Sequence, residues 1–201
     1  MLYISVSVNF DLSDKLIEFR DNLVRYKVEQ GFWVEINPLE VVLVTRMLYV
    51  PKKDCFRGVT DARIPNSFIV KKQLFVESLR TQLNYLKGST LYCSIDGKEM
   101  YHQLLHDDKH RIFCVFLNGK FYLQTRLGMG FKNLEVYLQQ AISYIYHEEG
   151  IGYDIMLRCA DNFLIHGTDD HDCAQKFIHV MEAFAKYGLV ISPQCDLLCN
   201  E

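Results

Sequence analysis

Two aspartates stand where they could hold a metal ion. Asp96 follows the apolar run 91–95, and Asp161 lies between the apolar runs 155–160 and 163–166. If the strands that carry them are neighbours in one sheet, their carboxylates could share one or two divalent cations. Two cations about 3.5–4 Å apart support in-line phosphoryl transfer by activating the attacking hydroxyl and stabilising the leaving oxygen. Aspartate is also common in turns without a catalytic role, so that alternative stays open.

The elements that must position these aspartates follow from the spacing of apolar residues. Helical spacing, in most cases closed by a glycine, predicts helices over 12–30, 72–86, 134–147 and 172–187. Alternating or β-branched runs predict strands over 32–36, 41–50, 57–61, 91–95, 111–117, 120–126, 155–160, 163–166 and 189–191. Asn118-Gly119 is typical of a tight hairpin, Lys52–Asp54 predicts a second turn, and Pro65–Ser67 predicts a loop. Helices interleaved with hairpins indicate an α+β fold.

Charge is distributed unevenly along the 201 residues, whose net charge is −3. Residues 46–87 carry nine bases and three acids, a local charge of +6, whereas residues 88–201 carry nine bases and fifteen acids, a local charge of −6. A basic stretch next to an acidic one can hold a polyanion in one place and a metal in another, although chance clustering explains the pattern equally well. No apolar run approaches the roughly 18 residues of a membrane helix, and the apolar start of the chain has no basic leader, so we expect neither a membrane span nor a signal peptide.

Cysteine and histidine patterns do not favour a zinc site. The seven cysteines form no Cys-X-X-Cys pair, which indicates reduced thiols in an intracellular protein. His102, His106 and His110 would share one face of a helix, but a strand and turn are expected there. The acidic run Asp169–Asp172 is interpreted as the N-terminal cap of the last helix.

Four motifs in order resemble reverse transcriptases, and more narrowly the gypsy-type LTR retrotransposon and retroviral group. Asp96 is followed five residues later by Tyr101 and then by His-Gln, as in the first catalytic motif of these enzymes. Residues 50–66 are similar to their fingers hairpin, and residues 127–133 are similar to the loop that packs against the templating base pair. Residues 159–165 are similar to the aromatic-X-Asp-Asp hairpin.

The resemblance implies the fingers and palm of a right-hand polymerase, with an antiparallel palm sheet backed by helices and with neither thumb nor RNase H. Residues 1–30 would form an N-terminal strand and helix, residues 31–90 a fingers-like hairpin and helix, and residues 91–201 the palm. The implied activity is RNA-directed DNA synthesis, in which a primer 3′-hydroxyl attacks the α-phosphate of a dNTP by a two-metal mechanism.

The resemblance also implies residue roles. Asp96 and Asp161 would be the ligands of Mg²⁺ or Mn²⁺, with Asn162 as the third catalytic position. Tyr101 would lie where a ribose 2′-hydroxyl would project, which would favour deoxynucleotides. The remaining nucleotide-binding residues would be Lys52 and Arg57, which would grip the triphosphate, and Met129 and Gly130, which would let the base pair approach the backbone. The implied partners are an RNA or DNA template–primer, a dNTP and further polymerase domains or a subunit, with no membrane, in the cytoplasm or nucleus.

Several positions depart from the family pattern. Asn162 stands where the second aspartate is expected and Cys159 where the aromatic residue is expected. Gly128, Leu134 and Glu135 stand where the family often has Pro, a small residue and Pro. The chain also ends before the expected primer-gripping hairpin. These departures favour an alternative hypothesis, in which a decayed or domesticated retroelement fragment acts as a nucleic-acid or protein binding module without turnover.

Overall fold

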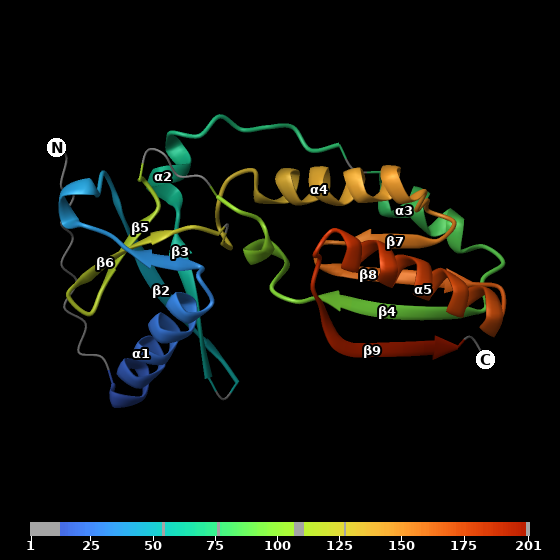
Figure 1. Ribbon diagram of the computed structural model, residues 1–201, viewed down its shortest axis with the longest axis horizontal. Helices are drawn as coiled ribbons and strands as arrows, with labels where there is room; N and C mark the ends of the chain where they lie inside the picture. The colour runs from blue at the N-terminus through green and yellow to red at the C-terminus, as the bar shows by residue number, and fades with distance from the viewer. Residues whose placement is uncertain (1–12, 54, 76, 107–110, 127, 200–201) are drawn as a thin grey trace. The chain divides into compact units, whose positions relative to one another are not determined.

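The computed structural model describes residues 13–53, 55–75, 77–106, 111–126 and 128–199. The chain divides into two compact units, each built from two separate stretches (Figure 1). Unit 1 contains the residues up to Lys72 together with Leu104–Leu134, and unit 2 contains Gln73–Gln103 together with the residues from Glu135 onward. The expected division into residues 1–30, 31–90 (fingers-like) and 91–201 (palm) stays a prediction. The predicted N-terminal strand, Asp54 and His110 lie outside the described residues.

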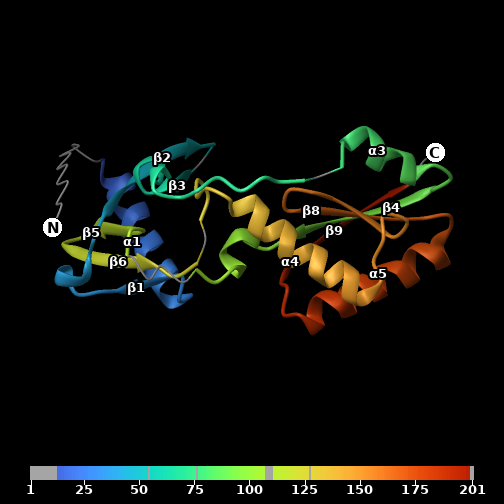
Figure 2. The same cartoon turned by 90° about the horizontal axis from the view of Figure 1, so that it is seen from above.

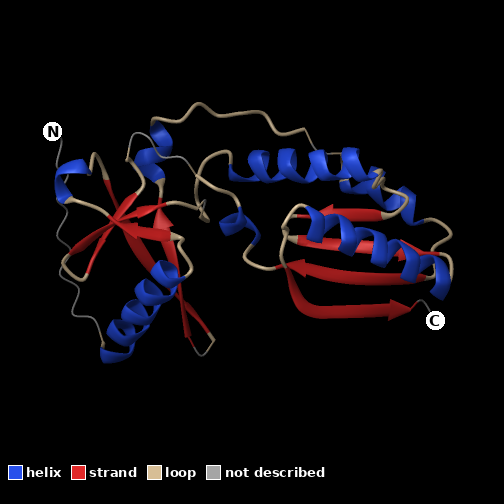
Figure 3. Ribbon diagram, in the orientation of Figure 1, coloured by secondary structure: helices blue, strands red, loops and turns tan. Residues whose placement is uncertain are grey.

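Unit 1 is a mixed five-stranded sheet with a long helix packed on it (Figure 3). Its strands lie in the order β1-β6-β5-β2-β3, and only the β2–β5 pair among them is parallel. Val24 of the helix packs with Trp33, Val115 and Tyr122 of the sheet in a buried core. The elements are α1 (Asp14–Glu29), β1 (Trp33–Glu35), η1 (Pro38–Glu40), β2 (Val44–Lys52), β3 (Cys55–Asp61), α2 (Arg63–Ser67), β5 (Cys114–Leu117) and β6 (Lys120–Gln124).

Unit 2 is an antiparallel four-stranded sheet in the order β7-β8-β4-β9. Helix α5 lies across β8 and β4 (Figure 1), and α4 crosses α5 and meets it at the C-terminal end of α4 (Figure 2). His179 Nε2 of α5 donates to the Glu149 carbonyl of α4 at 2.9 Å, which joins the two helices. The elements are α3 (Leu79–Leu83), η2 (Asn84–Leu86), β4 (Leu91–Gly97), η3 (Met100–Gln103), α4 (Leu134–Glu149), β7 (Met156–Cys159), β8 (Asn162–Gly167), α5 (Asp170–Lys186) and β9 (Ile191–Cys199).

The core of unit 2 is formed by the inward face of this sheet and the facing sides of its helices. Ile95 of β4 and Phe163 of β8 are buried, and the Phe163 ring lies 4.9 Å from the ring of Phe184 on α5. Alternate residues of β4 and β8 therefore face the helices, as the period of two in a half-buried strand requires. This packing fixes which ends of the two strands lie side by side.

One predicted helix begins later than expected, since only residues 79–86 of the predicted range are helical. Residues 71–75 are neither helix nor strand, and within the predicted range 72–86 the first helical residue is Leu79. Ser78 caps this helix, since its hydroxyl accepts a hydrogen bond from the Thr81 amide at 3.2 Å. Phe75 is 79% exposed, so the apolar spacing before Ser78 has no surface to pack against. Periodicity alone does not stabilise a helix that lacks such a surface.

Two smaller predictions also need correction. Pro65–Ser67 is the end of the short helix α2 rather than a loop, because a proline in the first helical turn removes no intrahelical hydrogen bond. The last strand, predicted over 189–191, extends over Ile191–Cys199. Pro193 lies within this strand, where the register between β4 and β9 shifts, and β9 is an edge strand. Proline is tolerated at such irregular edges.

The remaining sequence-predicted elements are confirmed to within a few residues. The β5–β6 hairpin turns at Asn118 and Gly119, whose φ values are 53° and 76°. Positive φ at both central residues is the geometry of a type I′ turn, which explains the glycine. None of the described helices is both long enough and apolar enough to cross a membrane.

Candidate active site

The candidate metal-binding carboxylates lie at one end of the β4–β8 pair. Asp96 is paired with Asn162 across the two strands, and Asp161 is in the turn that precedes β8. Ala160 forms the other half of that turn with φ of 56°, so the β7–β8 hairpin is very tight. The structure thus brings the three residues predicted as catalytic to the same edge of one sheet.

Backbone and side-chain hydrogen bonds fix this edge. The Gly97 amide donates to the Asp161 carbonyl at 2.8 Å, which joins the end of β4 to the hairpin turn. The Ser192 hydroxyl at the start of β9 donates to Asp96 Oδ2 at 3.0 Å. A Cβ on Gly97 would collide with the buried side chain of Met100, which would have to shift, so this position favours glycine.

The donor set at this edge fits a hard divalent cation. Asp96 and Asp161 supply carboxylates, and Asn162 supplies an amide oxygen without charge. Mg²⁺ is commonly bound by one or two carboxylates together with substrate phosphates and water. In the part of the chain that the structure describes, no group of three or more His, Cys, Asp or Glu side chains could hold a metal. Two carboxylates and one amide oxygen leave positions on such a cation for water or substrate phosphates.

Tyr101 belongs to the same unit and is hydrogen-bonded to an ion pair whose arginine side chain is largely buried. Its hydroxyl donates to Glu135 Oε2 at 3.2 Å, and Arg158 Nη2 donates to Glu135 Oε1 at 2.8 Å. Burial raises the pKa of the Tyr101 phenol, and the negative charges of Glu135 and Asp161 raise it further. The phenol therefore stays protonated and acts as a hydrogen-bond donor at neutral pH.

The predicted phosphate-binding residues lie on the β2–β3 hairpin of unit 1. Lys52 ends β2 and Arg57 is paired with Val50 across the hairpin. Both side chains are exposed. The hairpin thus presents two cations to solvent, as a site for a phosphate would require.

Met129 and Gly130, also in unit 1, form part of a loop held against α2. Asn66 Nδ2 donates to the Gly130 carbonyl at 2.7 Å, and the Lys132 amide donates to Asn66 Oδ1 at 2.8 Å. Gly130 has φ of 96°, a conformation that favours glycine, and a Cβ there would lie 3.2 Å from the Thr60 carbonyl. Met129 is 44% exposed. Lys52, Arg57, Met129 and Gly130 all belong to unit 1.

The structure accounts for the acidic run Asp169–Asp172 and for the histidines that were not expected to bind metal. Asp169 caps α5, because its side chain accepts from the Asp172 amide at 2.9 Å, as predicted. His102 lies in the short helix η3 and His106 lies beyond its end, so the described histidines do not share one face of a longer helix.

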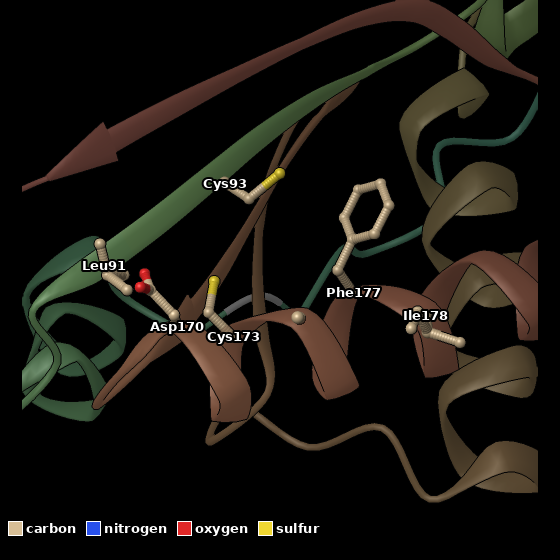
Figure 4. A pocket seen from close by; sticks show the side chains of 7 residues that line it. Leu91, Cys93, Asp170, Cys173, Phe177 and Ile178 are labelled. Carbon is tan, nitrogen blue, oxygen red and sulfur yellow. The ribbon is translucent and has the colours of Figure 1, made fainter.

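An open pocket of about 400 Å³ lies between β4 and α5 (Figure 4). Leu91 and Cys93 of β4 face Cys173 and Phe177 of α5 across it. Asp170 is the only charged residue among those that line it. Leu91 begins β4 and Asp96 lies near its end, so the pocket is at the opposite end of the strand from the candidate carboxylates.

Sequence reasoning missed the partners that orient the predicted residues. Arg158 and Ser192 were given no role, although each makes a side-chain hydrogen bond in or beside the candidate site. Glu135 was noted only because it stands where a proline is expected. A charged residue where the family pattern often has proline was the only sign in the sequence that Glu135 makes a specific contact.

Comparison with known proteins identifies the fold. No protein-family model and no curated protein matches the chain. Solved structures of foamy virus enzymes do match. The native prototype foamy virus protease-reverse transcriptase has a TM-score of 0.79 and 18% identity over 93% of this chain and 25% of that chain. The foamy viral protease-reverse transcriptase in complex with an RNA/DNA hybrid has a TM-score of 0.82 and 18% identity, over 94% and 25%.

The chain has a reverse transcriptase-like fold. A third match, to the foamy viral enzyme in complex with double-stranded DNA, has a TM-score of 0.76 and 17% identity, over 92% of this chain and 32% of that chain. The chain therefore spans between a quarter and a third of the length of these structures. At these identities the likeness concerns the fold, and the predicted α+β arrangement of fingers and palm is confirmed at that level.

Proposed function

We propose that this chain is the fingers and palm part of an RNA-directed DNA polymerase related to the gypsy-type and retroviral reverse transcriptases. The observation that carries the proposal is the pairing of Asp96 with Asn162 beside the Asp161 turn, on a reverse transcriptase-like fold. Two carboxylates at one sheet edge suit the transfer of a nucleotide from a dNTP to a primer 3′-hydroxyl.

The residues have distinct roles in this proposal. Asp96 and Asp161 hold Mg²⁺ or Mn²⁺, which when bound lowers the pKa of the attacking hydroxyl and neutralises developing charge on the phosphate. Lys52 and Arg57 bind the triphosphate of the incoming nucleotide. The Tyr101 ring excludes a ribose 2′-hydroxyl. Met129 and Gly130 contact the templating base pair, where the small glycine permits close approach.

The proposed partners follow from the same fold. Solved structures of the foamy viral enzyme contain double-stranded DNA or an RNA/DNA hybrid. We therefore assign a template–primer duplex as the nucleic-acid partner of this chain, with further polymerase domains or a second subunit assisting its grip. The seven cysteines without a Cys-X-X-Cys pair favour an intracellular location, in the cytoplasm or nucleus.

A second candidate function has specific support. Asn162 and Cys159 face each other across the β7–β8 hairpin, at the two positions where the family pattern has aspartate and an aromatic residue. An amide contributes a coordinating oxygen but no charge, which lowers affinity for a divalent cation. This departure favours a domesticated module that binds nucleic acid or protein without turnover.

Primer extension separates the two functions. The full chain is incubated with an RNA template annealed to a DNA primer, a dNTP and Mg²⁺ or Mn²⁺, beside Asp96→Asn and the surface control Asp14→Asn. Extension by the wild type and Asp14→Asn, abolished in Asp96→Asn, supports the polymerase. Extension no greater than that of Asp96→Asn overturns it, and duplex binding retained in a fluorescence anisotropy titration then supports the binding module.

A further inference from the structure

Glu135 joins two side chains from distant parts of unit 2. Its Oε2 accepts from the Tyr101 hydroxyl at 3.2 Å, and its Oε1 accepts from Arg158 Nη2 at 2.8 Å. Tyr101 lies in η3, Glu135 lies in the first turn of α4, and Arg158 lies on β7. A carboxylate whose two oxygens bond donors on different elements has its orientation fixed from both sides.

Arg158 is the least exposed of the three side chains and holds Glu135 from the other side. Its side chain is only 7% exposed, and Nη1 donates to Gln139 Oε1 at 2.5 Å, one helical turn beyond Glu135. A buried guanidinium that loses its carboxylate becomes an uncompensated buried charge, which is strongly unfavourable. Glu135 therefore cannot turn away without leaving the Arg158 guanidinium bonded only to the neutral Gln139 amide, and this holds Glu135 Oε2 in place for Tyr101.

Tyr101 needs such a constraint to act on a nucleotide sugar. A ring excludes a 2′-hydroxyl only if it cannot rotate away from it, and Tyr101 is partly exposed rather than packed on all sides. The hydroxyl bond to Glu135 anchors the far end of the ring. Burial together with Glu135 and Asp161 raises the pKa of the phenol, so the donor proton stays on Tyr101 and the anchor persists at neutral pH.

We propose that Glu135, held by Arg158, is a positioning residue that fixes the Tyr101 ring and thereby sets the discrimination between deoxyribonucleotides and ribonucleotides. The inference rests on the proposed function, because it requires that Tyr101 faces the nucleotide sugar. Glu135 stands where the resembling family often has proline, which has no side-chain acceptor, so a relative with proline there would lack this anchor.

The first test measures selectivity in a double-mutant cycle. Single-nucleotide incorporation of a dNTP and of the matching rNTP is followed with an RNA template and DNA primer in Mn²⁺, using the full chain. The variants are Tyr101→Phe, Glu135→Gln and the double substitution, with Glu148→Gln on the same helix as the matched control.

Each single substitution is expected to reduce the dNTP-to-rNTP ratio of kcat/KM by about tenfold, the scale of one hydrogen bond to a charged group. The reduction comes from a rise in kcat/KM for the rNTP, whereas general damage to the site would lower kcat/KM for both substrates. The double variant is expected to match the single variants, because Glu135 acts through the Tyr101 hydroxyl. Glu148→Gln leaves the ratio unchanged.

The second test does not depend on activity. In the chain labelled with ¹³C at tyrosine Cζ, the Tyr101 resonance is assigned by its loss in Tyr101→Phe. Glu135→Gln is expected to shift that resonance, because the phenol loses its charged acceptor, and Glu148→Gln is expected to leave it in place.

The outcomes distinguish the positioning role of Glu135 from the polymerase function on which it rests. An unchanged dNTP-to-rNTP ratio in Glu135→Gln, in a chain that extends the primer, overturns the positioning role and leaves the polymerase standing. A wild-type chain that neither extends the primer nor binds a dNTP overturns the polymerase and the selectivity role with it. An unmoved Cζ resonance in Glu135→Gln shows that the Tyr101–Glu135 bond is not formed in solution and overturns the inference in either case.

Discussion

Asp96 lies directly opposite Asn162 in the antiparallel pair of β4 and β8. An amide therefore occupies the position next to the candidate cation where the family pattern has a carboxylate. The backbone arrangement at this edge is that of two paired strands and a tight turn, and the charge is one unit less negative than the resemblance implies. A single substitution, Asn162→Asp, would therefore restore the charge of the family pattern without requiring a different backbone arrangement.

Asn162→Asp is expected to increase the affinity for Mn²⁺ by about tenfold, because ligand charge is a main determinant of affinity at oxygen-ligand sites. Electron paramagnetic resonance of free Mn²⁺ measures the dissociation constant directly. Asn84→Asp, an exposed substitution in η2 of the same unit, controls for the added charge. An equal affinity in the wild type and Asn162→Asp would show that this edge is not a cation site.

Gly97→Ala is expected to lower the free energy of unfolding by about 2 kcal/mol, the usual scale for overpacking a buried position. The new methyl group would collide with Met100, whose side chain is only 1% exposed. Urea unfolding followed by circular dichroism gives the value. Gly128→Ala is the matched control, since its added Cβ would meet Gln124 Oε1 and Phe131 at ordinary contact distances of 3.7 and 3.9 Å. Equal stability of the two variants would contradict the packing at Gly97.

Arg158→Met is expected to cost about 2–3 kcal/mol of unfolding free energy, because Glu135 and Gln139 lose a largely buried charged donor. The ion pair between Arg63 and Asp61 provides the control. Arg63 is 85% exposed, so Arg63→Met is expected to cost less than about 1 kcal/mol. Both values come from the same urea titration. If the two substitutions cost the same, the Arg158 side chain is not buried in solution.

Asp172 gives a prediction for pH. The Thr168 amide at 2.9 Å and Lys176 Nζ at 3.0 Å hold the pKa of its carboxyl below the ordinary value of 3.8. Its ionised form therefore contributes stability that is present above pH 3.8 and is lost as the pH falls through the lower folded value. Asp172→Asn is expected to lower the melting temperature at neutral pH, and the gap should close in strong acid. A gap that does not change with pH would refute the assignment.

The sequence predicted those parts of the fold that depend on local signals. The Asn118-Gly119 turn and the apolar run that ends at Asp96 are encoded within a few residues, and both are where they were expected. The same reasoning predicted that Asp96 and Asp161 would be useful only on neighbouring strands, and β4 and β8 are neighbours. The resemblance to reverse transcriptases supplied the residue roles, which remain predictions.

The features that the sequence did not predict depend on packing between distant segments. The apolar spacing of Leu74 and Phe75 looks helical, yet the segment has no sheet face to cover and Ser78 caps the helix later. The bond between Tyr101 and Glu135 joins residues 34 positions apart. No periodicity encodes such a contact, because it forms only when η3 and α4 are brought together by the fold.

The hydrogen bond from the Gly97 amide to the Asp161 carbonyl offers a direct gauge of the site. It joins the two chain segments that carry the carboxylates, so they cannot separate without exposing this amide to solvent. Its rate of hydrogen–deuterium exchange therefore measures how often the edge opens, in the absence of any ligand. One amide thus reports the local equilibrium between an assembled and a broken pair of carboxylates, whether or not the chain still turns over a substrate.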